Sequence, residues 1–430
     1  MGSVDRNAIC RHPNPESCPS SSGDCGSGPA MTANNRSAMT ARGCAMRTRS
    51  GRVVRFGEVV LPASKSESNR ALMIAAYGGF APDFQNLSDS KDTSVLAEAL
   101  RKTQSGASVI DIADCGTAAR FMTTYMACHE GEWILMGTER MKQRPILPLV
   151  KSLRELGADV QFVENEGRLP LRIKGRTIFG GKVQIDMHQS SQFASSLLLA
   201  APMWPEGLEM ELVGELTSLP YLEMTLAMMR HFGAEVERNG RTIIVKAKPY
   251  QSNGFVVSGD WSAASYWYEM AALSEECEIR LRGLSLSSLQ GDVVIVDWMK
   301  QLGVGTFVEK EALVLRKITF ENHPVCFDFA AHPDLYPTLA ATCAGLSVDA
   351  TFTGLDNLAL KESDRVGAMQ AELSKLGGRP LYFCSHNDHR IVMALAPLAL
   401  LYEPVSFDHP ETVEKSYPCF WADCSFLRAL

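Results

Sequence analysis

A helix-ending glycine recurs along the chain at a nearly constant interval, and this repeat constrains the fold more than any other feature. A leucine or phenylalanine followed by glycine closes an amphipathic segment at Gly157, Gly233, Gly303 and Gly377, roughly 70–76 residues apart. Glycine just past the last apolar residue is a common end of an α-helix. Strand-like stretches follow the first two glycines, so the spacing predicts repeated α/β units.

Polar clusters stand before several of the apolar segments that we predict to be helices. Ser64-Lys-Ser-Glu-Ser-Asn-Arg70 precedes the apolar run 71–77, and Lys361-Glu-Ser-Asp-Arg365 is a second such cluster. The free N–H groups at a helix start, together with the helix dipole, favour a bound anion. A capped surface helix with solvated charges would explain one cluster, but several in one chain favour a shared anion site.

Composition and charge limit the classes of protein to which the chain could belong. The 430 residues are 46% hydrophobic and 21% charged, with a formal net charge of −7. Such a chain has room for about two or three domains. Its acidity argues against nucleic acid as a partner, because phosphate-backbone binders carry a basic surplus. No apolar run reaches the roughly 18–20 residues that span a bilayer, so we expect no membrane segment.

The cysteines and histidines give no metal-binding pattern. The chain has 12 cysteines without a Cys-x-x-Cys pair and nine histidines without a His-x-x-x-His pair. We therefore expect no metal site and mostly reduced, structural thiols in a cytoplasmic protein.

Residues 1–50 differ from the rest in composition, because serine, glycine, asparagine, proline, arginine and cysteine dominate them. Such a segment cannot bury a core, and we predict that it is a disordered N-terminal extension. Six arginines and no acid between Met31 and Phe56 resemble an organelle transit peptide. An upstream extension, or a start at Met31, Met39 or Met46, is the interpretation that we favour.

An ordered series of polar and cationic motifs runs from about Leu61 to Tyr417. The series is Lys65-Ser-Glu-Ser-Asn-Arg70, Gly116-Thr-Ala-Ala-Arg120, Arg140-Met-Lys-Gln-Arg-Pro-Ile146, Ser190-Ser-Gln-Phe193, Gly259-Asp-Trp-Ser-Ala-Ala-Ser-Tyr266, Gln290-Gly-Asp292, Pro333-Asp334, Lys361-Glu-Ser-Asp-Arg365 and Asn387-Asp-His-Arg390. Each motif alone is weak, and a cationic run such as residues 140–145 is usually a solvated face, although Pro145 would suit the first turn of the helix that we expect after it. In this order the motifs resemble the 5-enolpyruvylshikimate-3-phosphate (EPSP) synthase family, the 3-phosphoshikimate 1-carboxyvinyltransferases.

The resemblance implies the fold of the enolpyruvyl transferases, a two-domain inside-out α/β barrel. Each domain would contain three βαβαββ units, with helices inside, sheets outside and helix starts facing the cleft between the domains. We expect domain I to comprise residues 51–63 and 259–430, and domain II residues 64–258. The two connections would cross near residues 255–260. The body is somewhat short for this family, which suggests trimmed loops.

The resemblance also implies a reaction. The carboxyvinyl group of phosphoenolpyruvate would pass to the 5-hydroxyl of shikimate 3-phosphate with release of phosphate, on the shikimate pathway of aromatic amino-acid biosynthesis. Both substrates are anions, which would account for the cationic clusters in an acidic chain. No cofactor is implied. We expect only small-molecule partners, with neither nucleic acid nor a membrane, and a monomer located in the cytoplasm, with an organelle as the alternative.

The resemblance assigns the site position by position. Asp334 would be the base for the 5-hydroxyl, Glu362 the proton shuttle at the methylene carbon, and Lys65 and Lys415 would assist the departing phosphate. The residues expected to bind shikimate 3-phosphate are Lys65, Ser66, Arg70, Ser190, Ser191, Gln192, Ser218, Tyr221, Asp334, Asn357 and Lys361. The residues expected to bind phosphoenolpyruvate are Lys65, Gly116, Arg144, Gln192, Arg365, Arg390 and Lys415.

Two alternatives stay open at this point, and departures from the family pattern bear on one of them. Where relatives commonly have Asn-x-Gly-Thr, this chain has Asp114-Cys-Gly-Thr117, and Phe121 replaces a common proline. Cys115 suggests the UDP-N-acetylglucosamine enolpyruvyl transferases, which use a loop cysteine, although Cys115 lies in a helix-start motif. The other alternative is a non-catalytic binding module of the same fold.

Overall fold

The computed structural model describes residues 39–41, 53–402 and 404–425, and two hydrophobic cores divide this part of the chain. One core contains buried residues between Ala71 and Tyr250. The other combines Val59 and Leu61 with residues between Trp261 and Cys424. We propose from these cores that the chain has the two predicted domains, and we name residues 64–258 the first lobe and residues 53–63 with 259–425 the second lobe. The predicted extension 1–50 lies outside the described residues except for the strand β1 (Met39–Ala41).

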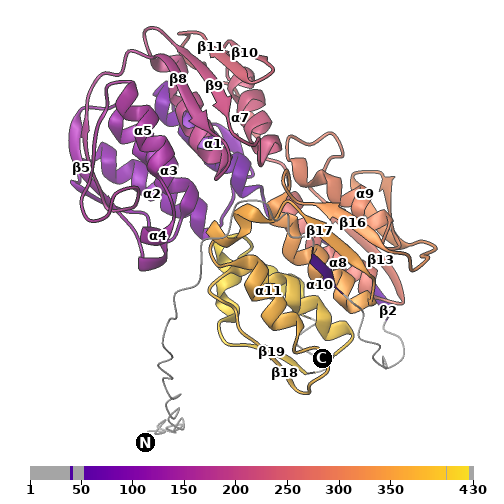
Figure 1. Ribbon diagram of the computed structural model, residues 1–430. Helices are drawn as coiled ribbons and strands as arrows, with labels where there is room; N and C mark the ends of the chain where they lie inside the picture. Colours follow the sequence, from indigo (N-terminus) through magenta and orange to yellow (C-terminus); the bar gives the residue numbers. More distant parts are fainter. Residues whose placement is uncertain (1–38, 42–52, 403, 426–430) are drawn as a thin grey trace, which may run out of the picture. The chain divides into compact units, whose positions relative to one another are not determined.

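The first lobe alternates helices with short strands, and its longer helices lie inside its sheets (Figure 1). Its helices are α1 (Lys65–Gly78), α2 (Lys91–Gln104), α3 (Gly116–Ala127), α4 (Glu139–Gln143), α5 (Leu147–Glu155), α6 (Ser191–Ala200) and α7 (Leu219–His231). Its strands are β3 (Phe84–Gln85), β4 (Val109–Asp111), β5 (Gly131–Met136), β6 (Asp159–Phe162), β7 (Leu171–Gly175), β8 (Gly181–Asp186), β9 (Leu208–Val213), β10 (Val236–Asn239), β11 (Thr242–Val245) and β12 (Phe255–Val256).

The second lobe has the same alternation. Its α-helices are α8 (Trp261–Leu273), α9 (Ile295–Lys300), α10 (Tyr336–Leu346), α11 (Arg365–Leu373), α12 (His389–Leu395) and α13 (Phe420–Asp423). Its strands are β2 (Val53–Val60), β13 (Glu276–Arg282), β14 (Val304–Glu309), β15 (Ala312–Lys317), β16 (Val325–Asp328), β17 (Ala350–Thr353), β18 (Leu381–Phe383) and β19 (Val405–Phe407). Three short 3₁₀ helices bear on the site, η3 (Pro333–Leu335), η4 (Asp356–Leu360) and η6 (Pro410–Lys415).

Three four-stranded sheets share one topology, with strand orders β4-β5-β7-β6, β8-β9-β11-β10 and β2-β13-β15-β14. In each sheet a parallel pair continues into an antiparallel hairpin. Each hairpin follows one of the repeated glycines, Gly157, Gly233 or Gly303, whose φ angles of 92°, 87° and 84° only glycine adopts easily. The predicted βαβαββ unit is therefore complete in these three sheets.

The other three sheets are reduced versions of that unit. β3 with β12 and β18 with β19 form two-stranded parallel sheets, and β16 and β17 form a parallel pair that β1 extends. For the β3–β12 sheet the cause is a short connection, because only residues 105–108 separate α2 from β4 and leave no length for a hairpin. The fourth repeated glycine, Gly377, lies in a turn after α11 rather than at a hairpin.

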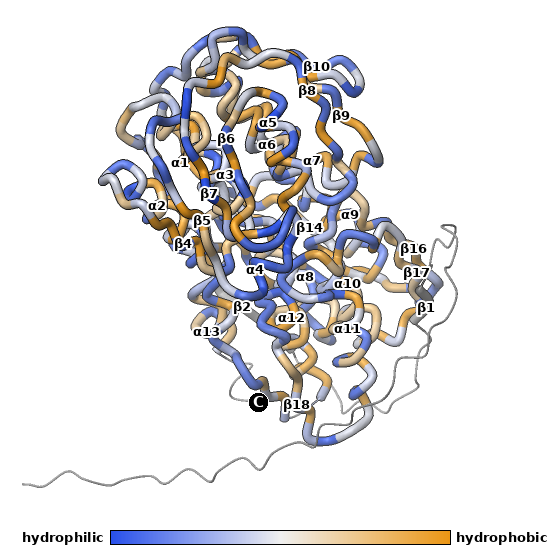
Figure 2. The backbone as a smooth tube through the Cα atoms, turned by 60° about the vertical axis from the view of Figure 1, so that its left-hand side comes forward, coloured by the Kyte–Doolittle hydropathy of each residue, from blue (hydrophilic) through white to orange (hydrophobic). Residues whose placement is uncertain are grey.

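The polar residues predicted at helix starts are N-caps. The side chains of Ser64, Cys115, Ser190 and Asp388 each accept a hydrogen bond from a backbone N–H in the first turn. Hydrophobic residues follow the polar start of α12, for example (Figure 2). One expected start is wrong, because Pro145 does not lie in the first turn of a helix. Instead, Arg140 and Lys142 of its motif lie on the short helix α4, Arg144 directly follows that helix, and α5 begins at Leu147 with Pro148 in its first turn.

The two connections between the lobes lie side by side. Ala63 bridges Gly259, the Ser64 N–H donates to Ser258 O over 2.8 Å, and the Asp260 N–H donates to Pro62 O over 2.9 Å. The buried carboxylate of Glu67 accepts both the backbone N–H and the hydroxyl of Ser258, over 2.9 and 2.6 Å. Backbone and side-chain hydrogen bonds thus hold one crossing strand to the other.

Membrane and metal features can be assessed only for the described residues. Within them, no helix combines the length and the apolar character that crossing a bilayer requires. Histidine, cysteine, aspartate and glutamate side chains in the same ranges also form no cluster that could hold a metal ion.

We predict that Glu269 of α8 lowers the stability of the fold at neutral pH. Its side chain has 0% exposure, neither carboxylate oxygen has a hydrogen-bond partner in the described ranges, and burial raises its pKa well above the ordinary value. The folded state therefore holds a proton that the unfolded state releases above about pH 4.3, so stability falls as the pH rises through that value.

Replacing the orphaned acid should remove this penalty. Glu269→Leu should raise the free energy of unfolding at pH 7 by about 1–3 kcal/mol. Denaturant unfolding at pH 5 and pH 8 should show a smaller loss of stability between the two values than in the wild type. Glu155→Leu, on the exposed face of α5, is the control and should change neither quantity. An unchanged pH dependence in Glu269→Leu would contradict the assignment.

Candidate active site

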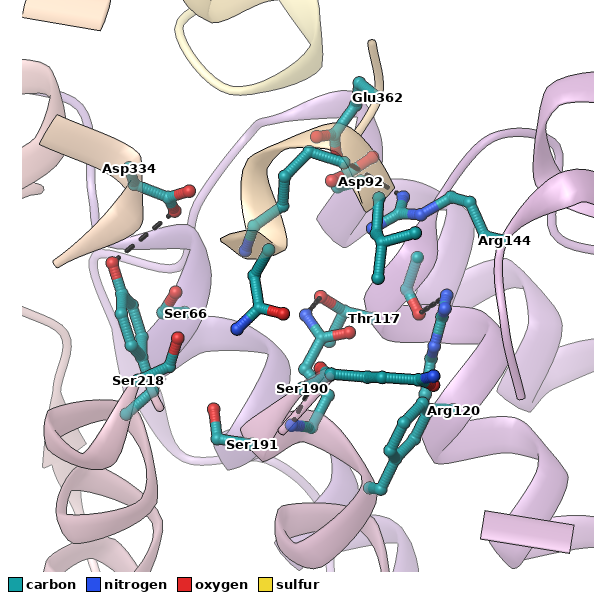
Figure 3. A pocket seen from close by; sticks show the side chains of 18 of the residues that line it. Ser66, Asp92, Thr117, Arg120, Arg144, Ser190, Ser191, Ser218, Asp334 and Glu362 are labelled. Atoms are coloured by element: carbon teal, nitrogen blue, oxygen red, sulfur yellow. Dashed lines mark hydrogen bonds and ion pairs between the residues drawn. The ribbon is translucent and has the colours of Figure 1, made fainter. Parts of the chain in front are cut away.

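Helix starts from both lobes converge on one cavity of about 90 Å³. The first lobe contributes the starts of α1, α3, α6 and α7, and the second lobe contributes η3, the segment after η4, and the starts of α11 and α12. Figure 3 shows side chains from these elements pointing toward one another. Free N–H groups and the positive ends of several helix dipoles therefore face the same space.

The structure brings nearly all of the sequence-predicted site residues together. Those that line the cavity are Lys65, Ser66, Arg70, Gly116, Arg144, Ser190, Ser191, Gln192, Ser218, Tyr221, Asp334, Asn357, Lys361, Glu362, Arg365 and Arg390. The exception is Lys415 at the end of η6, which lies behind the wall, 5% exposed, and contacts the lining residue Asp92.

Arg365 is the centre of the acidic side of the cavity. Its side chain is 1% exposed and donates from Nη1 to Asp334 Oδ1, from Nη2 to Glu362 Oε2 and from Nε to Asp388 Oδ2, each over 2.8 Å. A planar guanidinium with donors on several edges can satisfy such a set, whereas a lysine could not match its geometry. Arg365 therefore fixes the two proposed catalytic acids relative to each other.

Asp334 is held as an ionised acceptor at the other end of this network. Its Oδ2 also accepts from Arg390 Nη2 over 2.7 Å and faces the Tyr221 hydroxyl at 3.5 Å (Figure 3). Burial would raise the pKa of Asp334, but Arg390, Lys361 and Arg365 together hold it well below its usual value. Burial also lowers the pKa of the Lys361 ammonium.

Glu362 lies between two arginines from different lobes. In addition to Arg365, Glu362 contacts Arg144 of the first lobe, whose Nη1 lies 3.5 Å from Glu362 Oε1. Burial alone would raise the pKa of this carboxyl, but Arg144 and Arg365 hold it well below the ordinary value. Any anion that shares these arginines would weaken that effect.

Two lysines from opposite lobes meet at Asp92. Lys65 Nζ lies 3.0 Å from Asp92 Oδ2, and Lys415 Nζ lies 3.3 Å from Asp92 Oδ1. Lys415 also donates to the backbone oxygen and the carboxylate of Asp114. Burial would raise the pKa of Asp92, but Lys65 and Lys415 lower it overall. Burial would lower the pKa of Lys415, but its contact with Asp92 helps to raise it overall. Lys415 is therefore held as a cation.

Hydroxyl groups cover the opposite side of the cavity, where Arg70 holds the backbone in place. Arg70 donates to Thr225 Oγ1, Ser66 O and Tyr221 O over 2.7, 2.8 and 3.0 Å. Ser218, at the start of α7, has a left-handed φ of 54°, and its N–H donates across the lobes to Ala330 O over 2.8 Å. A non-glycine residue in that conformation is often found at a functional site.

Several polar lining residues were not predicted, namely Asp92, Thr117, Arg120, Gln189 and His389. Arg120 donates to Gly116 O and Pro145 O, so it holds the backbone of two lining residues in place. His389 is buried without a hydrogen bond in the described ranges, and burial lowers its pKa well below the usual value. Arg120, Thr117 and His389 lie inside quoted motifs that could have identified them. Asp92 had only its place in the first turn of a helix as a signal.

The cavity is strongly cationic although the chain is acidic overall. Three carboxylates, those of Asp92, Asp334 and Glu362, line the cavity. The lining cations outnumber them and are Lys65, Arg70, Arg120, Arg144, Lys361, Arg365 and Arg390. Such a site can bind a ligand with two or more anionic groups and can present acids to its reacting atoms.

The chain belongs to the EPSP synthase family. Residues 102–424 match the family model for EPSP synthase (3-phosphoshikimate 1-carboxyvinyltransferase). A protein named 3-phosphoshikimate 1-carboxyvinyltransferase from Bacteroides fragilis is 42% identical over 386 residues, covering 85% of this chain and 93% of that protein. One of the same name from Histophilus somni is 34% identical over 421 residues, covering 85% and 95%.

Solved structures show the same fold. An EPSP synthase from Acinetobacter baumannii matches with a TM-score of 0.69 and 21% identity, over 88% of this chain and 97% of that one. The enolpyruvyl transferase NikO from Streptomyces tendae matches with a TM-score of 0.61 and 15% identity, over 91% and 97%. The predicted enolpyruvyl transferase fold is thereby confirmed.

We predict that Cys115 is an inert cap and not a reactive thiol. It is 0% exposed, its Sγ accepts the Ala118 N–H over 3.4 Å, and burial raises its pKa to about 12. At pH 8 iodoacetamide should alkylate the exposed Cys326 and Cys419 of the folded protein and leave Cys115 unmodified, as mass spectrometry would show. Cys115→Ser keeps a capping oxygen and should change turnover less than about three-fold. Rapid labelling of Cys115 would contradict this role.

Proposed function

We propose that this protein is a 3-phosphoshikimate 1-carboxyvinyltransferase, which transfers the enolpyruvyl group of phosphoenolpyruvate to the 5-hydroxyl of shikimate 3-phosphate. The family and the relatives of that name support the proposal. The observation that carries it is the pair of acids, Asp334 and Glu362, bound to one buried guanidinium inside a cationic cavity. The reaction needs two anion sites with acid–base groups between them. A cationic cavity that contains these two acids fits that need.

The hydroxyl-lined side suits shikimate 3-phosphate, which carries one phosphate, one carboxylate and two free hydroxyls. Lys65 and the hydroxyls of Ser66, Ser190, Ser191, Ser218 and Tyr221 would bind its polar groups, with Asn357 and Lys361 closing over it from the second lobe. Arg70 would act mainly by holding the backbones of Ser66 and Tyr221, because the protein already occupies three of its donors. Asp334, beside Tyr221, would accept the 5-hydroxyl proton.

The cationic side suits phosphoenolpyruvate. Arg144, Arg365 and Arg390 would bind its carboxylate and phosphate, because guanidinium groups match both in a two-pronged geometry. The Gly116 N–H, at a helix start, and Lys65 and Lys415 would stabilise the phosphate as it leaves. Gln192, whose amide donates to Thr117 Oγ1 over 3.1 Å, would lie between the two substrates.

Substrate binding would also tune the acids. Arg144 and Arg365 hold the pKa of Glu362 low, and Arg390, Lys361 and Arg365 hold that of Asp334 low. Anionic groups on these cations would offset their charge and raise both pKa values. Glu362 would then be able to carry a proton to the methylene carbon, and Asp334 would become a stronger base, only when both substrates are bound.

The alternatives receive less support. A UDP-N-acetylglucosamine enolpyruvyl transferase would use a reactive loop cysteine, whereas Cys115 is a buried N-cap with a raised pKa. A non-catalytic module would not need to keep Lys65, Asp334, Glu362 and Arg390 around one cavity, with Lys415 paired to its lining residue Asp92. A monomer in the cytoplasm that needs no cofactor stays part of the proposal.

A phosphate-release assay tests the proposed function. With phosphoenolpyruvate and shikimate 3-phosphate together, the protein should release phosphate and form one carboxyvinyl product per phosphate, detectable by mass spectrometry. Phosphoenolpyruvate with UDP-N-acetylglucosamine should give no release above that with phosphoenolpyruvate alone. Release with the nucleotide sugar in place of shikimate 3-phosphate would overturn the proposal.

We predict that the two acids act on bond making rather than on binding. Glu362→Gln and Asp334→Asn should each lower kcat by at least about a hundredfold, the usual contribution of one acid–base group, and change KM much less. Glu139→Gln on α4 and Asp356→Asn on η4 are exposed controls from the same regions and should keep normal turnover. Near-normal kcat in either test variant would remove that residue from its role.

A further inference from the structure

Arg140, a cation of α4 that the proposed function does not use, reaches from the first lobe into the second. Its Nε donates to the backbone oxygen of Glu362 over 2.9 Å, and its Nη2 donates to that of Lys361 over 2.8 Å. The same Nη2 lies 3.4 Å from the backbone oxygen of Ala359. One guanidinium thus contacts three carbonyls of a single turn, which carries two of the proposed site residues.

The chemistry of this contact favours a fixed geometry. The three carbonyls lie at and just after the C-terminal end of η4, where unpaired acceptors and the negative end of the local dipoles attract a cation. Within the described ranges Arg140 forms no ion pair, so its charge strengthens these hydrogen bonds rather than meeting a carboxylate. Its remaining contact is with Gln143 of its own helix.

We propose that Arg140 is a positioning residue that clamps the 359–362 turn when the lobes meet and thereby sets the location of Glu362. Arg144, which directly follows α4, contacts the Glu362 carboxylate, while Arg140 holds the Glu362 backbone. The same short segment of the first lobe thus contacts both the backbone and the carboxylate of Glu362. A shift of about 1 Å at a reacting group can lower a rate a hundredfold, so this grip affects turnover directly.

The proposal rests on the proposed role of Glu362, and a double-mutant cycle tests the connection. Arg140→Gln should lower kcat about 10- to 100-fold, and Arg140→Lys, which keeps the charge but not the fork, should give an intermediate loss. Lys142→Gln is the matched control, because Lys142 lies on the same helix and, among the described residues, pairs only with Glu139 and Glu164. It should leave kcat unchanged. In the Glu362→Gln background, Arg140→Gln should lower kcat by less than about three-fold.

A second measurement does not depend on turnover. Amide hydrogen exchange over peptides that cover residues 359–363 should be faster in Arg140→Gln than in the wild type or in Lys142→Gln. If Arg140→Gln does not fold, as judged by circular dichroism, Arg140→Lys carries both measurements.

The outcomes separate the clamp from the proposed function. An inactive wild type with faster exchange in the variant would reject the function and keep the clamp, whereas unchanged exchange would reject the clamp. An equal loss of kcat in both backgrounds, or a normal kcat in Glu362→Gln, would show that Arg140 does not act through Glu362.

Discussion

The charge of one buried guanidinium, that of Arg365, determines where the acids of the cavity lie. Asp334 lies in η3, Glu362 precedes α11 and Asp388 caps α12, so these three elements meet at a single side chain. Removing that side chain would leave three carboxylates with little solvent and no common partner, a cost far larger than the loss of one exposed ion pair. The packing of the second lobe around the cavity therefore depends on the same contact as its chemistry.

The charge of the cavity is opposite in sign to the net charge of the chain. The chain is acidic as a whole, yet helix starts and arginines make the cavity cationic. Carboxylates already bind most of those cations, through Asp92, Asp334, Glu362 and Asp388. An anionic ligand would thus compete with fixed acids, and the acids that it releases from the cations would become stronger bases. Under the proposed function, binding and activation would be linked through one set of charges.

Local sequence signals predicted much of the fold and most of the cavity. A cap such as Ser64 or Ser190 acts within one helical turn, so its neighbours in sequence reveal it. Gly157 and Gly233 likewise mark turns that only a glycine fits well. The ordered motifs placed the remaining lining residues through family resemblance, while their roles stay proposals.

Other features left no such signal. Asp92 is defined by partners in both lobes, and an ion pair between distant segments leaves no periodic pattern. Arg140 binds main-chain carbonyls, which every residue carries, so its partners cannot be recognised from side chains. The expected first turn at Pro145 was wrong, because the preceding residues form the short helix α4 and the next helix begins only at Leu147.

The parallel pairing of β2 with β13 has a consequence for the order in which the protein is made. β2 is synthesised before the whole first lobe, yet its partner strand begins only at Glu276. On the ribosome, the first lobe can complete its core while β2 still lacks a neighbour. An unpaired strand can pair with another chain, so β2 is exposed to that hazard until the residues from Glu276 onward have been made.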